Sequence, residues 1–191
     1  MSVEIVPEKP EHAVLIDPLL DRTFGITRRQ RTTYRLRDGV APIPALCFAS
    51  VDDEGSFLGS LRFWPLFVGG RDAILLGPLA VDPMLQGQGI GKALVAHGLA
   101  AAAALGHRIC VVVGPPAYYR PFGFINASAA GLIMPGPVEP ARFQVMELVP
   151  GALEGLHGVL QKAEDAESPG ALPGLPREDA RGSASLALPG Q

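Results

Sequence analysis

Along residues 1–150 the apolar positions follow two different periods, which predict strands and helices in alternation. Apolar residues spaced three and four apart predict helices over Pro10–Phe24 and residues 89–105. Pro18 interrupts the first of these, so we expect either a kink or a second helical piece that starts there. Apolar, β-branched runs bounded by turn residues predict strands. The expected strands are Val3–Pro7, 45–51, Phe57–Val68, 73–81, 108–113, 124–132 and 142–149.

The pattern changes at Pro150. Residues 151–162 are expected to form one short helix. Residues 163–191 are rich in Ala, Pro, Gly, Ser and acidic residues and contain no aromatic residue, so they cannot bury enough apolar surface to become ordered. The sequence therefore predicts one domain over residues 1–150, followed by a short helix and a flexible tail.

Residues 77–94 place three alternate glycines between a strand and a helix. The glycines are Gly87, Gly89 and Gly91, and a long alanine-rich helical stretch begins at Lys92. Such a junction presents unpaired backbone N–H groups at the positive end of the helix dipole. Glycine also lets a ligand approach the backbone closely. The segment therefore predicts an anion site of the kind that binds phosphate.

Spacing excludes two other phosphate-binding patterns at this segment. The dinucleotide fingerprint G-x-G-x-x-G would put its third glycine on Lys92, and the acid expected about 20 residues later is missing. The nucleoside-triphosphatase loop needs glycine at Gln86 and Ser or Thr at Ala93. Two interpretations are left: a phosphate-binding loop with the pattern Gln-x-x-Gly-x-Gly, or a glycine-rich turn that only reverses the chain.

Two segments resemble a known family. Gln86-x-x-Gly89-x-Gly91, after a strand that ends in Val-Asp-Pro, resembles the coenzyme A pyrophosphate loop of the GNAT-type N-acetyltransferase superfamily. The run from Tyr119 to Phe124 resembles the short helix and Tyr-x-x-x-Gly-Phe signature near the end of that superfamily's core. With a helix over residues 28–37, the element order β-α-α-β-β-β-α-β-α-β-β also matches. The resemblance covers residues 1–150 and is strongest toward small bacterial predicted acetyltransferases.

The resemblance implies a GNAT-like α/β (α+β) fold, with a mixed, mostly antiparallel central sheet and helices on both faces. It implies that strands 73–81 and 108–113 splay apart and leave a gap for a thioester. It also implies that pantetheine lies like an added strand against the backbone of Leu79, Ala80 and Val81.

The pyrophosphate would then meet N–H groups of the glycine-rich loop. The residues implied in this contact are Gln86, Gly87, Gln88, Gly89, Ile90, Gly91 and Lys92. A cation such as Lys92 in the first turn of a helix opposes the helix dipole, and a nearby phosphate would offset this cost. The alternative is an exposed lysine without a role.

Tyr119 is the catalytic residue that the resemblance implies. When an amine attacks a thioester, the tetrahedral intermediate expels a thiolate, and a hydroxyl within hydrogen-bond reach can protonate it. The alternative is that Tyr119 is a core aromatic with its hydroxyl in water, while Tyr118 is expected to pack. Many relatives add a glutamate base, but residues 109–113 offer none. Asp82, before Pro83, is better explained as a turn residue, so the base is left unassigned.

The function implied is an N-acetyltransferase that moves an acetyl group from acetyl-CoA to a primary amine of a small molecule. The amine would attack directly in a ternary complex. The alternative is a non-catalytic acyl-CoA sensor or interaction module that keeps the glycine-rich loop, an interpretation that the missing strand carboxylate favours and Tyr119 disfavours.

Charge narrows the set of partners. Sixteen Lys and Arg against 19 Asp and Glu give a net charge of −3, which argues against general binding of nucleic acid. Five arginines nevertheless cluster in residues 28–37. They form either an ordinary solvated face or a surface that attracts an anionic acceptor or the outer phosphate of coenzyme A. A homodimer is left open.

Composition argues against a membrane protein and against a metal site. No apolar run reaches the length of a membrane span, and the N-terminus has acids and prolines where a signal peptide has an apolar block, so we expect a cytoplasmic protein. Cys47 and Cys110 lie in apolar runs and are expected to be buried, reduced thiols. The four histidines have no metal-ligand spacing, so no metal cofactor is expected.

Overall fold

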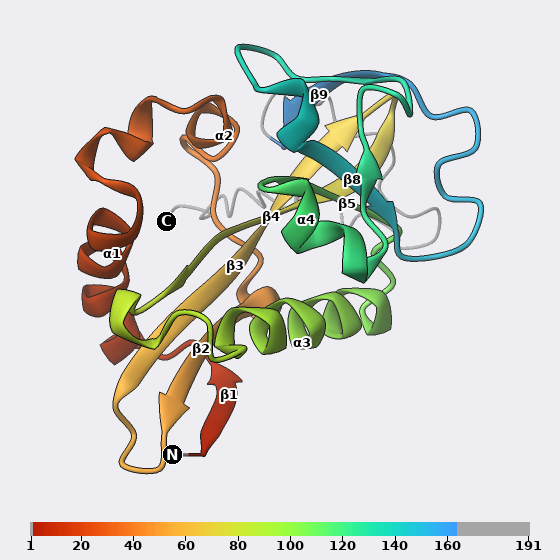
Figure 1. Ribbon diagram of the computed structural model, residues 1–191. Coiled ribbons are helices and arrows are strands. Elements are labelled where there is room, and N and C mark those ends of the chain that lie inside the picture. The colour runs from red at the N-terminus through yellow and green to blue at the C-terminus, as the bar shows by residue number, and fades with distance from the viewer. Residues whose placement is uncertain (1, 164–191) are drawn as a thin grey trace, which may run out of the picture.

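The fold is a nine-stranded mixed sheet with helices on both faces (Figure 1). A computed structural model describes residues 2–163. The strands are β1 (Val3–Pro7), β2 (Cys47–Asp52), β3 (Phe57–Val68), β4 (Arg71–Val81), β5 (Ile109–Val113), β6 (Ile125–Asn126), β7 (Leu132–Ile133), β8 (Phe143–Glu147) and β9 (Gly158–Lys162). The helices are α1 (Pro10–Phe24), α2 (Thr32–Arg35), α3 (Ile90–Ala104) and α4 (Pro116–Tyr119), with 3₁₀ turns η1 (Ile26–Gln30), η2 (Pro44–Leu46), η3 (Pro83–Leu85), η4 (Arg120–Phe122) and η5 (Pro140–Arg142).

Most strand pairs in the sheet are antiparallel, as the sequence predicted. The main path runs β1-β2-β3-β4-β5-β8-β6, and β9 pairs with β3 and β7. Only the pairs β4–β5 and β7–β9 are parallel among the described strands. The long strand β3 therefore pairs with β4 along one edge, and along the other edge with β2 in its first half and with β9 in its second.

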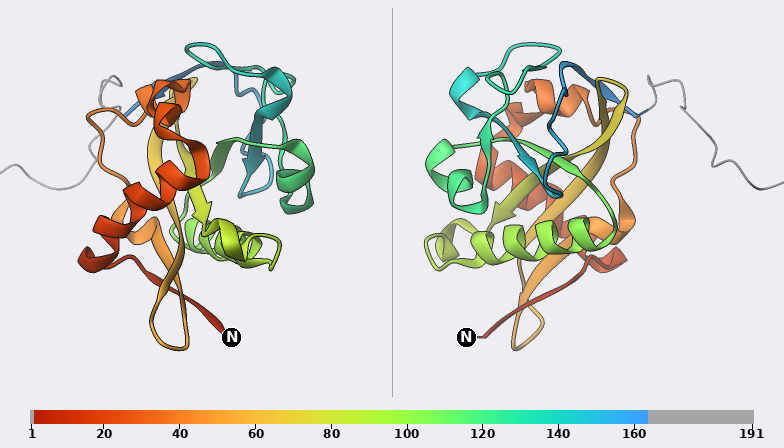
Figure 2. Two further views of the ribbon diagram at one scale, coloured as in Figure 1. Left: turned by 60° about the vertical axis from the view of Figure 1, so that its left-hand side comes forward. Right: turned by 90° about the vertical axis from the view of Figure 1, so that its right-hand side faces the viewer.

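A different helix packs against each face of the sheet (Figure 2). On one face, α3 packs its apolar side against β2, β3 and β4, with Leu94 and Val95 fully buried. On the other face, α1 packs Ile16, Leu19 and Leu20 against β4. Because neighbouring strand residues point to opposite faces, β4 contributes side chains to both layers.

Several predicted elements have the bounds that the sequence indicated. Strands β1 and β3 and helix α1 match the expectation, and α3 differs from it by one residue at each end. Pro18 lies inside α1, which runs as a single element. Cys47 and Cys110 are buried free thiols, as expected. No helix among residues 2–163 is long and apolar enough to cross a membrane.

Two predicted helices are wrong. The helix expected over residues 28–37 is divided into η1 and α2, because Arg31 between them has an extended backbone (ψ 145°). The helix expected over residues 151–162 is instead a series of turns followed by β9, and the domain therefore extends past residue 150 to the end of this strand.

Glycines prevent that second helix. Leu153, Leu156 and Leu160 have helical spacing, but the glycines between residues 151 and 158 all adopt positive φ. Leu156 and Leu160 instead pack in the core beside β3. The expected strand over 124–132 is reduced to the short strands β6 and β7, and the tail predicted over 163–191 lies outside the described residues apart from its first residue.

We expect Gly98→Ala to destabilise the protein although alanine favours helices. A Cβ at Gly98 would lie 2.6 Å from the ring of Phe63, which is fully buried. Overpacking of this kind costs about 1–3 kcal/mol, more than the helix propensity of about 1 kcal/mol gained. Denaturant unfolding measures the difference, and Ala100→Gly at an exposed site of α3 calibrates the propensity. A rise in the unfolding free energy of Gly98→Ala would contradict the packing described.

Candidate functional site

Strands β4 and β5 stay paired over a short distance and then separate. Only Ile74↔Cys110 and Leu75↔Val111 are partners in their parallel ladder. Immediately after Leu75 and Leu76, β4 contains a bulge, in which two residues, Gly77 and Pro78, lie opposite the single residue Arg62 of β3. Proline has no N–H to donate and is tolerated in sheets at such bulges. The bulge therefore lies where a gap opens between the two strands.

Beyond the bulge, β4 presents to the gap backbone groups that no neighbouring strand pairs, although the carbonyl of Val81 accepts from the side chain of Gln86. The N–H of Asp82 donates to the carbonyl of Leu58 on β3, at 2.8 Å. Because hydrogen-bonding groups alternate along a strand, the backbone of Ala80 also faces β3, while that of Leu79 and Val81 faces the gap. The side chain of Ala80 packs against α1. Of the three residues implied by the sequence, the geometry thus leaves Leu79 and Val81 accessible from the gap.

The loop after β4 leads directly into α3. Asp82 caps η3 by accepting from the N–H of Met84 at 2.9 Å, which agrees with a turn-forming role. Gly87 and Gly89 have φ near +85°, a conformation that only glycine adopts readily. Gly89 is the N-cap of α3, and its carbonyl accepts the first helical hydrogen bond, from Ala93.

The first turn of α3 is a suitable place for an anion. Its leading N–H groups have no carbonyl partner within the helix, and no acidic residue lies in this turn. Lys92 projects from the turn and lines the adjoining cavity, whereas Gln88 is exposed and does not line it. Gln86 lies at the start of the loop, where its side-chain amide donates to the carbonyl of Val81 at 3.4 Å.

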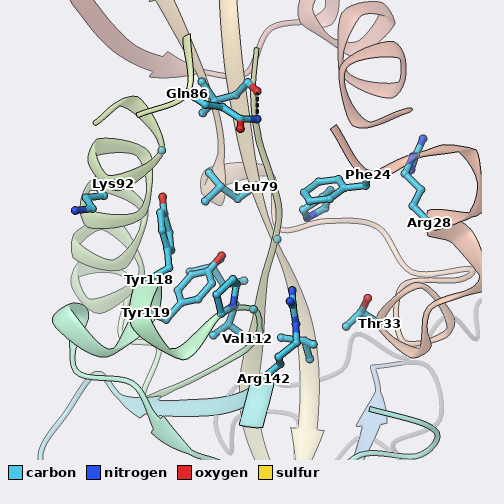
Figure 3. A pocket seen from close by; sticks show the side chains of 18 of the residues that line it. Phe24, Arg28, Thr33, Leu79, Gln86, Lys92, Val112, Tyr118, Tyr119 and Arg142 are labelled. Carbon is cyan, nitrogen blue, oxygen red and sulfur yellow. Dashed lines mark hydrogen bonds between the residues drawn. The ribbon is translucent and has the colours of Figure 1, made fainter. Parts of the chain in front are cut away.

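A single cavity of about 650 Å³ joins the loop, the gap and the helices beyond it. Figure 3 shows Lys92, Tyr118 and Tyr119 on the α3 side of β4, and Arg28 and Thr33 on the α1–α2 side. Nine of the site residues named from the sequence line it: Leu79, Val81, Gln86, Gly87, Gly89, Ile90, Gly91, Lys92 and Tyr119. None of the described residues that line it is Asp or Glu.

Tyr119 is held against the end of β5 by close packing. Its side chain is 6% exposed and its ring packs edge-on against Phe124. A Cβ at Gly114 would lie 2.2 Å from the Tyr119 ring, so only glycine fits there. The buried amide of Gln144 donates to the Gly114 carbonyl at 2.9 Å and fixes this linker.

The hydroxyl of Tyr119 is a proton donor at neutral pH. Burial raises its pKa above the usual value, and the positive charges of Arg37 and Arg142 act in the opposite direction. Within residues 2–163 this hydroxyl makes no hydrogen bond, and it belongs to a residue that lines the cavity. The structure therefore places an uncommitted, protonated hydroxyl beside the gap.

Tyr118 lies closer to the glycine-rich loop than the sequence indicated. Its hydroxyl is 2.7 Å from the point where a Cβ of Gly91 would lie, so it sits over the first turn of α3. Burial raises the pKa of this half-buried side chain as well. Tyr118 was expected only to pack, and its position depends on how α4 docks against α3, for which the local sequence gives no signal.

The arginine cluster separates into neutralised and unpaired members. Arg28 is 2% exposed and donates to Asp21 at 2.7 Å, to Asp17 at 2.8 Å and to the hydroxyl of Tyr34 at 2.7 Å. These bonds raise its pKa despite burial, and they tie α1 to the segment that follows it. Arg28 is thus a structural residue whose charge is balanced.

Other arginines that line the cavity have no acidic partner among the described residues. These are Arg31, Arg37 and Arg142. Arg142 was not singled out from the sequence, because an isolated arginine before a strand carries no local signal. Within residues 2–163, no group of three or more His, Cys, Asp or Glu residues could hold a metal ion.

Comparison with known proteins points to one family. The model of the acetyltransferase (GNAT) family matches residues 15–124. The chain is 36% identical over 160 residues to the uncharacterized N-acetyltransferase YhbS of Escherichia coli strain K12, which covers 82% of this chain and 94% of the relative.

Solved structures agree with this similarity. A crystal structure of YhbS from Escherichia coli in complex with CoA has a TM-score of 0.73 and 34% identity, covering 85% of this chain and 90% of that one. A GNAT family acetyltransferase from Brucella melitensis in complex with acetyl-CoA has a TM-score of 0.57 and 28% identity, covering 78% and 90%.

We expect Gly114→Ala to destabilise the protein by forcing the Tyr119 ring to move. The clash is closer than any normal Cβ contact, and its cost should be about 1–3 kcal/mol in denaturant unfolding. In a Tyr119→Leu background, where the ring is absent, the same substitution should cost clearly less. Equal costs in the two backgrounds would show that the ring does not depend on this glycine.

Proposed function

The chain belongs to the acetyltransferase (GNAT) family, and we propose that it moves an acetyl group from acetyl-CoA to the primary amine of a small molecule. The amine attacks directly in a ternary complex. One observation carries this proposal: a single cavity connects the glycine-rich start of α3, through the gap between β4 and β5, to the buried hydroxyl of Tyr119. A phosphate site, an open strand edge and a proton donor then lie in the order in which acetyl-CoA needs them.

In this proposal, the cofactor enters from the α3 side. Its pyrophosphate binds the N–H groups of the loop from Gly87 to Lys92, where two glycines with positive φ and the helix dipole favour an anion. The Lys92 ammonium adds a positive charge. The pantetheine arm of the cofactor lies along β4 and forms hydrogen bonds with the backbone of Leu79 and Val81. The relatives crystallised with CoA and acetyl-CoA support this use of the cavity.

The chemical step needs little beyond positioning and one proton. The amine nitrogen attacks the thioester carbonyl and forms a C–N bond, while a backbone N–H at the gap stabilises the oxyanion. The C–S bond then breaks and Tyr119 donates its proton to the thiolate. The nitrogen, which became positively charged on attack, releases one proton, and water carries a proton back to the tyrosinate. The charges of Arg37 and Arg142 help here, because they oppose the rise in the pKa of Tyr119 that burial causes.

The proton of the amine is not assigned to a side chain. The described residues that line the cavity include no carboxylate, and Asp82 is occupied as the cap of η3 and lies 3.8 Å from Arg22. The amine therefore enters in its neutral form, and after attack its nitrogen loses a proton to water.

Tyr119→Phe should lower kcat by about 100-fold or more, since general acid catalysis typically contributes this much. The affinity for acetyl-CoA, measured by calorimetry, should stay near the wild-type value because the ring remains. Tyr118→Phe removes the neighbouring hydroxyl, which lies over the first turn of α3, and serves as the comparison: its kcat should fall far less than that of Tyr119→Phe. An unchanged kcat in Tyr119→Phe would remove this residue from the mechanism.

Gly89→Val should weaken binding of acetyl-CoA and CoA by at least about 100-fold, the equivalent of one or two charge-assisted hydrogen bonds. The residue has φ +86°, which a β-branched side chain rarely adopts, and its Cβ would project into open space where the phosphate is proposed to lie. Gly106→Val is the matched control. Gly106 has φ +84° and the same open surroundings at the other end of α3.

Calorimetric titration of both variants separates strain from ligand contact. Both substitutions introduce the same backbone strain, so both should lose some stability, but only Gly89→Val should lose cofactor binding. Wild-type affinity in a folded Gly89→Val protein would mean that the glycine-rich loop does not hold the pyrophosphate.

A further inference from the structure

The α1–α2 side of the cavity carries positive charge without a counter-charge. Arg31, Arg37 and Arg142 line it, and no Asp or Glu does so among the described residues. None of the three forms an ion pair within residues 2–163. Arg28, a few residues away, shows that the fold supplies carboxylates where a charge is to be balanced, since it has both Asp17 and Asp21.

Arg37 is held at the point where β4 leaves β5. Its guanidinium lies over the rings of Tyr34 and Trp64, 5.1 and 5.9 Å from their centroids. One terminal nitrogen is 3.3 Å from the position of a Gly77 Cβ, beside the β4 bulge. The Nε atom is buried and has no hydrogen-bond partner. An unpaired buried donor is costly unless a ligand completes it.

The charge of Arg37 persists at neutral pH. Burial lowers its pKa to about 10, which still leaves the guanidinium protonated in any ordinary assay. The two aromatic rings stabilise the cation by cation–π contact and leave its outer edge free for an anion.

Arg142 lines the same cavity as Arg37 but comes from the segment just before β8. It ends η5 just before β8, and its carbonyl accepts from the N–H of Gly114 at 2.9 Å, which fixes its backbone to the linker that precedes Tyr119. Figure 3 shows its side chain pointing into the cavity between Tyr119 and Thr33. Arg37, Arg142 and Tyr119 all line the same cavity.

We propose that the acceptor is an amine that also carries a carboxylate or a phosphate, and that Arg37 and Arg142 bind this anion. The inference rests on the proposed acetyl transfer. Guanidinium groups pair with either anion through two parallel hydrogen bonds. With the anion held there, the amine at the other end of a short molecule points to the gap, where the thioester lies. The phosphates of coenzyme A are held on the α3 side instead, at Lys92 and the glycine-rich loop.

The test compares matched acceptors in a thiol-release assay with saturating acetyl-CoA. The pairs are glycine and glycinamide, β-alanine and β-alaninamide, and O-phosphoethanolamine and ethanolamine. We expect kcat/KM to be about 10- to 100-fold higher for the anionic member of at least one pair, the loss typical of one charged hydrogen-bond partner. For the first two pairs, greater basicity cannot explain this preference, because the amides have the more acidic ammonium groups and so supply more neutral amine. The carboxylate and phosphate pairs distinguish the two anions.

Variants connect the preference to the two arginines. Arg142→Gln should lower the ratio of kcat/KM between the anionic acceptor and its amide or ethanolamine partner about 10- to 100-fold. Any effect of the lost charge on Tyr119 is shared by both members of a pair and cancels in this ratio. Calorimetric binding of acetyl-CoA should stay at the wild-type value. Arg37→Gln should do the same. Because Arg37 also packs against two rings, Arg142 provides the decisive test if Arg37→Gln fails to fold. Arg120→Gln is the matched control: it removes the same charge beside Tyr119 in the sequence, but its side chain is exposed and outside the cavity.

The outcomes separate this inference from the acetyltransferase proposal. Three results would each overturn the proposal of an anionic acceptor, even where acetyl-CoA binds. These are equal rates for both members of every pair, transfer to neither member of any pair, and an Arg142→Gln enzyme that keeps the wild-type preference. Failure of acetyl-CoA and CoA to bind the wild-type protein would contradict the proposed function itself.

Discussion

The short parallel ladder between β4 and β5 is the constraint on which the rest of the site depends. Two residue pairs hold the strands together, and a bulge at Gly77 and Pro78 then turns β4 away while β3 continues to pair with it. The sheet stays intact on the β3 edge, so the gap does not divide the core. Backbone groups that a regular sheet would use internally become available to a ligand, and both helical layers gain access to one cavity.

The two sides of that gap differ in how they present positive charge. On the α3 side it comes mainly from backbone, through the N–H groups of a helix start and glycines with positive φ, a geometry suited to a phosphate that lies close to the chain. On the α1–α2 side it comes from guanidinium groups held by rings and by the linker at Gly114. Tyr119 lies between these regions, where the proposed cofactor and acceptor meet.

Much of the fold and half of the site could be predicted from local sequence. The glycine-rich loop and the segment from Tyr119 to Phe124 are short, contiguous sequence motifs, so they can be recognised without a structure. Arg142 and the hydroxyl of Tyr118 could not be predicted, because their roles depend on β8 and α4 docking beside segments that are distant in sequence. For the same reason, the strand β9 was not expected: Leu153, Leu156 and Leu160 have helical spacing, and only pairing with the edge of β3 shows that Leu160 belongs to a strand.

A cavity that is lined by arginines, and by no carboxylate among residues 2–163, also affects the protonation of what enters it. An ammonium ion there meets like charges, and like charges lower the pKa of a base. Three guanidinium groups outnumber a single anion on the acceptor, so the local potential remains positive after it binds. The nucleophile would then lose its proton to solvent before attack, and the groups that orient the acceptor would also activate it. On this proposal, the electric field of the cavity favours the neutral amine, and water rather than a lining side chain accepts its proton.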